Sequence, residues 1–412
     1  MDSTFQALLA EVDRDTDRNQ RFLHLTPNEP VMSDTARQFL LSPLSDRYYF
    51  GPGVDGVMDN GAFTSLGLTG VGKMVDAASE VIKQTLGANV VNLNCLSGVH
   101  AMMCVLLSTT KAGDTVMTLD HDHGGHFATK GILKQTGRRS IDTVYDFENQ
   151  CFDAAATAAR FHESGATLLY MDVSYYTAPI DIKTLRDAIG PDAIIAFDAS
   201  HTFGLMMGGA MPSPLLEGAD IVCANTHKTL PGPQKGLIAF RAEELGNRAN
   251  DIINGCLFSS AHTGSLLALS TTILEMDTYG HDYAEQVVAN SQALGEALAE
   301  HGFDVRQNLD GTYSRTHQVH LRTDTIGNRR DIYDALYRNS IAVAFDSPTI
   351  LQNGTFIRLG TQETTRRGMK QDDMKTIARF IHDAVNGKDI KQEVEAFKQS
   401  FSEIHYSFDA HS

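Results

Sequence analysis

The chain has 412 residues, of which 42% are hydrophobic and 21% are charged, so it is long enough for two domains with a sizeable core. The formal net charge of -17 disfavours nucleic acid and anionic membrane surfaces as partners. Five scattered cysteines without a CxxC pair are typical of a reduced cytoplasmic protein. We expect no secretory signal at the acidic N-terminus. We also expect no membrane span in the uncharged stretch 88–110, because its polar residues, such as Asn92 and Asn94, would be unfavourable in hydrocarbon.

The predicted elements begin with a short helix over residues 1–20, followed by an irregular arm. From about residue 70 onward the spacing of apolar residues alternates between the helical and the strand period. Helices are predicted at 71–87, 97–110, 151–164 and 182–190, and strands at 90–96, 115–120, 167–174, 193–200 and 219–225. Short apolar strands that alternate with helices predict an α/β fold with a mostly parallel sheet covered on both faces.

A long helix predicted over 281–302 leads to a smaller α+β segment. We therefore divide the chain into an N-terminal arm and interface segment at 1–60, a large domain at 61–280 and a small C-terminal domain at 281–412.

Polar clusters follow four of the predicted strands. These clusters are Ser97-Gly98, HDHGGH at 121–126, DASH at 198–201 and NTHK at 225–228. Because ligands of open α/β sheets bind at the carboxyl ends of the strands, we expect the four clusters to converge on one site.

Asp198 and Lys228 each end an apolar run, and the 30 residues between them allow one strand–connection–strand unit. Pyridoxal phosphate needs such a pair, because its aldehyde condenses with a lysine amine and its ring nitrogen must stay protonated. A carboxylate beside that nitrogen favours the protonated form. A surface salt bridge is the alternative explanation for either residue alone.

Three further features fit an anionic, aromatic ligand, and each has a plainer alternative. Ser97-Gly98 opens a predicted helix, where N–H groups bind phosphate, although many such turns are simple helix caps. Arg358 lies in the apolar run FIRLG and needs an anionic partner, either a substrate carboxylate or a structural ion pair. His126, after a Gly-Gly turn, is placed to stack on a cofactor ring.

The histidine loop has two alternative interpretations. His121, His123 and His126 could bind a metal ion, but no further ligand spacing completes a known metal site, so we assign no metal. A solvated polar loop is the other alternative.

Four segments in order resemble the serine hydroxymethyltransferase family. They are LDHDHGGHFATKG, FDASHTFGLMMGG, NTHKTLPGPQKG and FIRLGTQETTRRGMKQDDM. The resemblance spans most of the chain and implies the aspartate aminotransferase-like fold (fold type I), with pyridoxal 5'-phosphate as cofactor.

The resemblance also implies roles for matching residues. Lys228 would hold the cofactor as a Schiff base, Asp198 would contact the pyridine nitrogen, and His126 would stack on the ring. Ser174 and His201 would lie near the phenolic oxygen and the substrate. The implied phosphate contacts are Ser97, Gly98 and Thr226, with Val99 as a further implied cofactor contact. The implied contacts of the substrate carboxylate are Arg358 and Asn28. In this family a homodimer completes each site, so Tyr48 and Gly264 would come from the second subunit.

Two residues depart from the folate-dependent members of the family. Phe50 stands where those members have a glutamate for folate-linked proton transfer, and Phe345 stands near a place where they usually have an asparagine. Both changes replace polar groups with apolar ones and put folate binding in doubt. With Phe50 in place, we expect His126 or Tyr48 to act as the base, directly or through water.

Four segments resemble the L-threonine transaldolase branch of this family in their residues. They are NTHKTLPGPQKG, THQVH, TRRGMK and YSFD. The sequence therefore predicts a cytoplasmic enzyme that transfers a glycine unit from L-threonine to an acceptor aldehyde that the sequence does not identify. The enzymatic alternatives are a tetrahydrofolate-dependent hydroxymethyltransferase, a threonine aldolase and a racemase-like activity. A non-catalytic cofactor-binding subunit and a histidine-rich metal protein are the alternatives from other classes.

Overall fold

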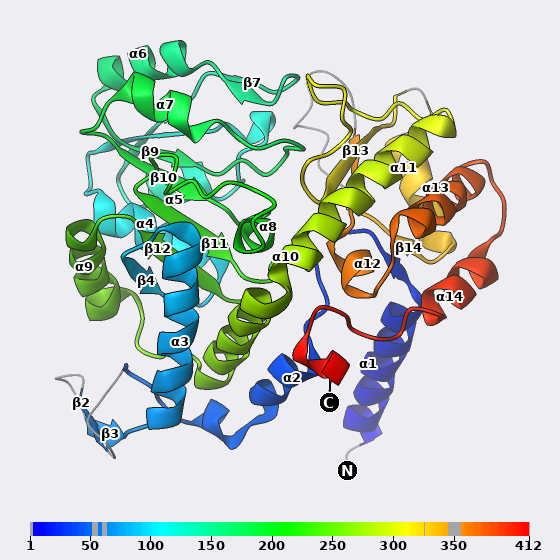
Figure 1. The fold of residues 1–412 in the computed structure, drawn as a ribbon, viewed down its shortest axis with the longest axis horizontal. Coiled ribbons are helices and arrows are strands. Elements are labelled where there is room, and N and C mark those ends of the chain that lie inside the picture. The colour runs from blue at the N-terminus through cyan, green and yellow to red at the C-terminus, as the bar shows by residue number, and fades with distance from the viewer. Residues whose placement is uncertain (1–2, 52–56, 60–63, 325, 345–355, 412) are drawn as a thin grey trace.

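A computed structural model describes residues 3–51, 57–59, 64–324, 326–344 and 356–411. The centre of the larger part is a seven-stranded sheet (Figure 1). Its strands, in spatial order, are β4 (Val90–Asn92), β12 (Gly236–Phe240), β11 (Ile221–Asn225), β10 (Ile194–Asp198), β9 (Ala166–Met171), β5 (Thr115–Thr118) and β6 (Arg139–Asp142). Within this sheet only β12 is antiparallel to its neighbours, so the predicted mostly parallel sheet is confirmed.

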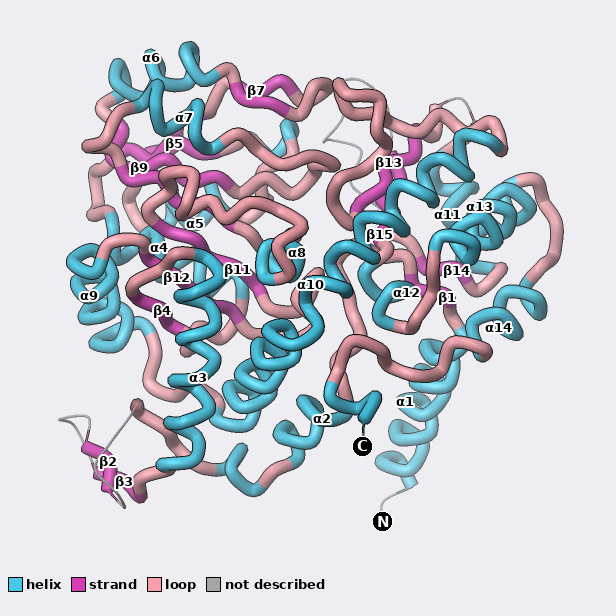
Figure 2. The backbone as a smooth tube through the Cα atoms, in the orientation of Figure 1, coloured by secondary structure: helices cyan, strands magenta, loops and turns pink. Residues whose placement is uncertain are grey.

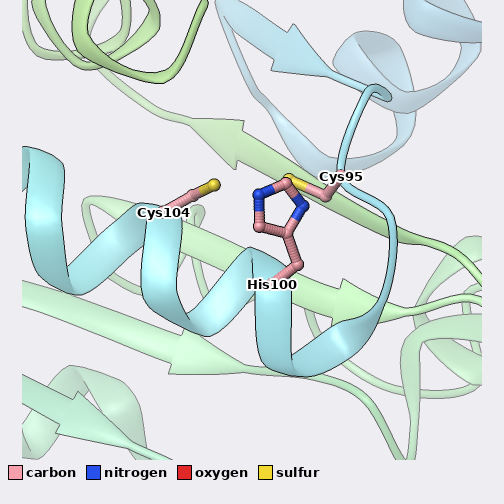
Figure 3. A group of neighbouring side chains, drawn as sticks. All are labelled: Cys95, His100 and Cys104. Carbon is pink, nitrogen blue, oxygen red and sulfur yellow. The ribbon is translucent and has the colours of Figure 1, made fainter. Parts of the chain in front are cut away.

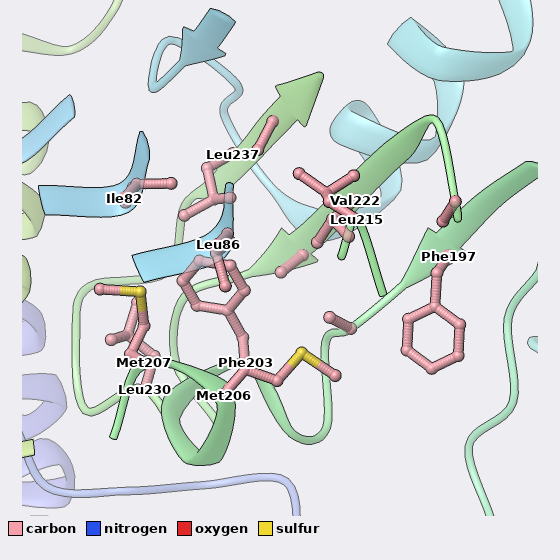
Figure 4. Close-up of a cluster of buried hydrophobic side chains, with 14 of the residues drawn as sticks. Ile82, Leu86, Phe197, Phe203, Met206, Met207, Leu215, Val222, Leu230 and Leu237 are labelled. Carbon is pink, nitrogen blue, oxygen red and sulfur yellow. The ribbon is translucent and has the colours of Figure 1, made fainter. Parts of the chain in front are cut away.

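Helices cover both faces of the sheet, because alternate residues of each strand point to opposite sides. In β10, Ile195 and Phe197 contribute to one core, whereas Ala196 contributes to the other. The first core is covered by α3 (Thr69–Leu86), α6 (Ala154–Ser164), α7 (Ile182–Ile189) and α8 (Phe203–Met207). The second is covered by α4 (Gly98–Thr109), α5 (Thr129–Gln135) and α9 (Glu243–Ile252). Figure 4 shows α8 and α3 side chains meeting the sheet in the first core.

Local sequence signals set the ends of several helices. The helix predicted at 71–87 is α3, and it ends where Gly87 adopts a left-handed conformation with φ 72. The helix predicted from residue 151 begins later, at Ala154, because the Asp153 side chain accepts a hydrogen bond from the Ala156 N–H and caps it. Cys151 and Phe152 instead form the short strand β8 (Cys151–Phe152), which pairs with β7 (Tyr145–Asp146).

One helix of 38 residues, α10 (Thr263–Glu300), runs between the larger and the smaller part of the molecule (Figure 1). The predicted helix at 281–302 is only its second half. The first half is buried on nearly all sides, so it lacks the amphipathic period that reveals a surface helix. Side chains of α10 as far as Val287 belong to the first core of the sheet, and Leu294 begins a separate core. The division proposed at 280/281 lies within this continuous helix.

The smaller part combines two short sheets with helices (Figure 2). β13 (Gln318–Arg322) pairs antiparallel with β15 (Phe356–Gly360), and β1 (Leu23–His24) pairs parallel with β14 (Ile341–Ala342). The other elements of this part are α1 (Ser3–Arg21), α11 (Arg329–Arg338), α12 (Gln362–Arg366), α13 (Gln371–Val385) and α14 (Lys391–Gln399). The short helix α2 (Asp34–Arg37) packs against α10. Among the described helices, none combines the length and apolar character needed to cross a bilayer.

Candidate active site

A cavity of about 400 Å³ lies at the carboxyl ends of β9, β10 and β11, beside the N-terminus of α4. The predicted site residues that line it are Asn28, Ser97, Gly98, Val99, His126, Ser174, Asp198, His201, Lys228 and Arg358. A larger cleft of about 1030 Å³ lies beside α1 and the C-terminal segment, and it contains none of the predicted site residues. The four polar clusters therefore converge on one site, as the strand-end argument predicts.

Lys228 and His201 meet because they follow neighbouring parallel strands. The Nζ atom of Lys228 lies 3.0 Å from Nε2 of His201. Desolvation lowers the pKa of Lys228 to about 8, although the Asp198 carboxylate acts in the opposite direction. Burial also lowers the pKa of His201 well below its usual value. Near neutral pH a minor fraction of Lys228 is therefore the neutral amine, which is the nucleophilic form, and this fraction is far larger than for an exposed lysine.

Asp198 ends β10 and is held in one orientation by two donors. Its Oδ2 accepts a hydrogen bond from the Tyr170 hydroxyl at 3.0 Å, and its Oδ1 accepts one from the Ser200 N–H at 3.0 Å. Each carboxylate oxygen has two lone pairs, so Asp198 can still accept a hydrogen bond from a protonated nitrogen of a ligand in the cavity.

The N-terminus of α4 provides an anion site at another edge of the cavity. Ser97 caps this 12-residue helix, and its Oγ accepts a hydrogen bond from the His100 N–H at 3.0 Å. The N–H groups of a first helical turn are otherwise free to bind a phosphate. A Cβ atom at Gly98 would lie 2.8 Å from Cβ of Asn225, so glycine allows α4 to approach the end of β11 this closely.

His126 is positioned through its backbone by Asp172, which sequence reasoning missed. Oδ2 of Asp172 accepts hydrogen bonds from the His126 N–H at 3.1 Å and from the Thr129 hydroxyl at 2.5 Å. Burial raises the pKa of Asp172 to about 7, and the nearby Asp198 charge adds to this effect. The ring of His126 lines the cavity, and its Nδ1 accepts a hydrogen bond from the Ala128 N–H at 3.2 Å.

Arg358 lies on β15 with 5% of its surface exposed. Its Nη1 donates to the Ser174 carbonyl at 3.1 Å, and its guanidinium lies 3.9 Å from the centre of the Tyr175 ring. Asn28 lines the same cavity. The Ser174 carbonyl and the Tyr175 ring orient this guanidinium at the cavity, where a carboxylate is the ligand that suits it.

Three predicted site residues do not line the cavity of their own chain. The buried Thr226 hydroxyl donates to the Pro233 carbonyl at 2.5 Å and accepts from the Lys235 N–H at 3.1 Å, so it stabilises the turn that follows β11. Gly264 lies at the start of α10, where a Cβ atom would come within 2.0 Å of Oγ of Ser45. Tyr48 is 53% exposed and stacks on Phe50 at 5.3 Å. Phe345 lies outside the described residues.

The cavity has further lining residues beyond the individually predicted site residues. His121, Gly125, Ser200, Asn225 and His227 belong to the predicted polar clusters, whereas Met102, Phe127, Asp172, Val173 and Tyr175 lie outside them. Asp172 and Tyr175 lie within two residues of the predicted Ser174, directly after β9. Their position at the same strand end could have indicated that they belong to the site. Oδ1 of Asn225 and Nδ1 of His227 are buried without a hydrogen-bond partner among the described residues. Such atoms suit a polar ligand in the cavity.

Metal donors gather away from the predicted histidine loop. Among the described residues, the group close enough to hold an ion is Cys95, His100 and Cys104, whose donor atoms lie within 4.8 Å of one another (Figure 3). Nδ1 of His100 accepts from the Leu96 N–H at 2.9 Å, and Nε2 lies 3.0 Å from the Leu257 carbonyl. Because both nitrogens are engaged, His100 serves to fix the turn before α4.

Comparisons with known proteins agree with this geometry. The model of the serine hydroxymethyltransferase family matches residues 2–381. The chain belongs to this family. It is 36% identical to fluorothreonine transaldolase of Streptantibioticus cattleyicolor over 88% of this chain, but it spans only 57% of the length of that protein. It is 32% identical to serine hydroxymethyltransferase of Pyrobaculum islandicum over 96% of this chain and 93% of that protein.

A solved structure extends the likeness to three dimensions. The crystal structure of L-threonine transaldolase from Pseudomonas fluorescens, in an internal aldimine state, superposes with a TM-score of 0.89 at 28% identity, over 99% of this chain and 94% of that one. The expected fold class of this family, fold type I, is thereby confirmed.

The residues of the cavity fit pyridoxal phosphate, the cofactor expected from the sequence and confirmed by the family match. Lys228 presents an amine, Asp198 a carboxylate and α4 an N-terminus, and all three face the same cavity. These groups complement the aldehyde, the pyridine nitrogen and the phosphate of the cofactor.

Proposed function

We propose that this protein is a pyridoxal-phosphate-dependent transaldolase, which transfers the glycine unit of L-threonine to an acceptor aldehyde and forms a β-hydroxy-α-amino acid. The main support is the match to two transaldolases, one by sequence and one by structure. Phe50 adds to it, because it replaces the glutamate that serves folate-dependent members of the family. A tetrahydrofolate-dependent hydroxymethyltransferase is the second candidate, supported by the match to the Pyrobaculum enzyme along nearly its whole length.

The cofactor, when bound, supplies an aldehyde for imine formation and a ring that accepts the electron pair of the broken Cα–Cβ bond. The neutral amine of Lys228 provides the nitrogen that holds it, and the Asp198 carboxylate keeps the proton on its ring nitrogen. Arg358 binds the carboxylate of L-threonine and orients the Cα–Cβ bond for cleavage.

The base that removes the threonine hydroxyl proton is proposed to be Tyr48, directly or through water. His126 is the other candidate, but its Nδ1 already accepts the Ala128 N–H. A neutral ring with Nδ1 as acceptor carries its proton on Nε2, and it therefore donates rather than accepts there.

The proposal includes a homodimer whose active sites are shared. Tyr48 is exposed and does not line the cavity of its own chain, so a second copy would have to supply it. The exposed apolar side chains of α1, namely Phe5, Leu8, Leu9 and Val12, follow helical spacing and offer a surface for that copy. The five free cysteines suit a reducing compartment, so the cytoplasm is the proposed location.

The test is to incubate the purified protein with L-threonine and an aldehyde panel, without folate, and to measure acetaldehyde and new amino acids by mass spectrometry. We expect both products, and Lys228→Ala should abolish them. Lys235→Met is the matched control, because Lys235 is also buried but donates to the Ala261 carbonyl at 2.9 Å and does not line the cavity. Rapid conversion of L-serine to glycine only with tetrahydrofolate would instead establish the second candidate.

A further inference from the structure

A row of buried polar side chains extends from Lys228 into the smaller part of the molecule. Gln318 and His320 lie on β13, two residues apart and therefore on the same face of the strand. They are 0% and 1% exposed. Both belong to the THQVH segment, and the reaction described above gives neither of them a role.

The amide of Gln318 has one orientation, because its neighbours fix it. Nε2 of Gln318 lies 3.1 Å from the Ser174 carbonyl oxygen, which can only accept a hydrogen bond. The amide nitrogen must therefore face Ser174. This orientation turns Oε1 toward Nε2 of His320 at 3.1 Å, so that nitrogen carries a proton and donates it.

The fixed amide in turn determines the tautomer of His201. The Nε2 group of Gln318 has a second N–H, and Nδ1 of His201 lies 3.4 Å from it. Facing a donor, Nδ1 acts as the acceptor, so neutral His201 carries its proton on Nε2. That Nε2 faces the Lys228 nitrogen at 3.0 Å.

We propose that Gln318 and His320 are positioning residues that hold His201 as a proton donor to the Lys228 nitrogen. His201 then cannot take the hydroxyl proton of the substrate at Nε2, which leaves that task to another base. This hydrogen bond forms with the neutral amine of Lys228, because a protonated ammonium group has only donors. The inference deepens the proposed function, since it assigns a proton within the same site.

Neutron diffraction of holoenzyme crystals exchanged into D₂O tests the proton positions directly. We expect deuterium on Nε2 of His201 and on Nε2 of His320, and none on Nδ1 of His201. Deuterium on Nδ1 of His201 would overturn the inference.

Two substitutions test the cause. In Gln318→Glu, a carboxylate that only accepts replaces the amide donor, so deuterium should appear on Nδ1 of His201. In Gln318→Met, a side chain of similar length removes all three hydrogen bonds of the amide. Each variant should bind pyridoxal phosphate about fivefold more weakly, the loss expected for one buried hydrogen bond.

The control is Gln362→Met, because Gln362 is equally buried but donates to the Thr26 and Glu29 carbonyls at 2.7 Å, outside this row. It should leave cofactor affinity unchanged. Equal weakening in Gln362→Met and Gln318→Met would show a general packing effect and contradict the positioning role. The deuterium positions and the cofactor affinity do not depend on which aldehyde or folate the enzyme uses. The proposed proton position can therefore be wrong while the transaldolase activity is confirmed, and it can be right while that activity is absent.

Discussion

Burial shifts the ionisable side chains around Lys228 toward their neutral forms. It lowers the pKa of Lys228 to about 8 and that of His317 to about 3, and it raises the pKa of Asp172 to about 7. Near physiological pH the imidazoles of His201 and His317 are therefore neutral, and the lowered pKa of Lys228 increases the fraction present as the nucleophilic amine.

Arg358→Lys tests the substrate-binding role at the scale of one residue. Lysine keeps the positive charge but loses the planar pair of donors, so KM for L-threonine should rise roughly 10-fold to 100-fold, as expected for a lost charge-assisted hydrogen bond. Steady-state kinetics at saturating acceptor aldehyde would measure it. An unchanged KM would contradict carboxylate binding by Arg358.

Asp172 makes stability depend on pH. Its pKa is about 7 in the folded chain against 3.8 in the reference state, so the folded state holds the proton more tightly. The stabilising contribution is full below about pH 4 and is lost as the pH rises to about 7, a decline on the order of 3 kcal/mol.

Asp172→Asn should remove this decline, because asparagine does not titrate. Relative to the unmodified protein, the free energy of unfolding of the variant should rise between about pH 4 and pH 7. Urea titrations at several pH values measure the difference, with the exposed Asp192→Asn as control. Parallel pH profiles for Asp172→Asn and the unmodified protein would refute the assignment.

At the scale of elements, the crossing of α8 and α10 depends on small residues. A Cβ atom at Gly208 would lie 2.1 Å from the Gly280 carbonyl oxygen and 2.4 Å from Cβ of Ala284. This close approach positions α8, which follows the DASH cluster containing Asp198 and His201.

Gly208→Ala should therefore force the helices apart and lower the free energy of unfolding by about 1–3 kcal/mol, the usual cost of overpacking. Gly131→Ala is the control. Gly131 lies on the helix α5, and a Cβ atom there would contact no neighbouring segment within 4 Å. Chemical denaturation would compare the two. A loss at Gly131 as large as that at Gly208 would contradict the packing argument.

At the scale of the whole molecule, the proposed shared sites can be tested by mixing inactive variants. If Tyr48 acts on the partner's cavity, a heterodimer of Lys228→Ala and Tyr48→Phe chains contains one intact site. Unfolding and refolding an equal mixture should restore about a quarter of full activity, since half of the dimers are mixed. Two variants that stay inactive after verified subunit exchange would contradict shared sites.

The alternation of apolar strands and helices was sufficient to predict the parallel sheet. Strand periodicity and strand-end polarity are local properties, so they also placed Asp198, His201 and Lys228 at one site. The first half of α10 escaped prediction, because a helix buried on all sides has no amphipathic period.

Contacts between distant segments could be known only from the folded chain. Asp172 supports the backbone of His126, 46 residues earlier, and Gln318 reaches His201 across 117 residues. Thr226 follows a strand end like the other predicted residues, but its hydroxyl donates to the Pro233 carbonyl within the turn after β11 and does not line the cavity. Hydrogen-bond partners depend on distance and direction in space, and no pattern along the chain encodes either quantity.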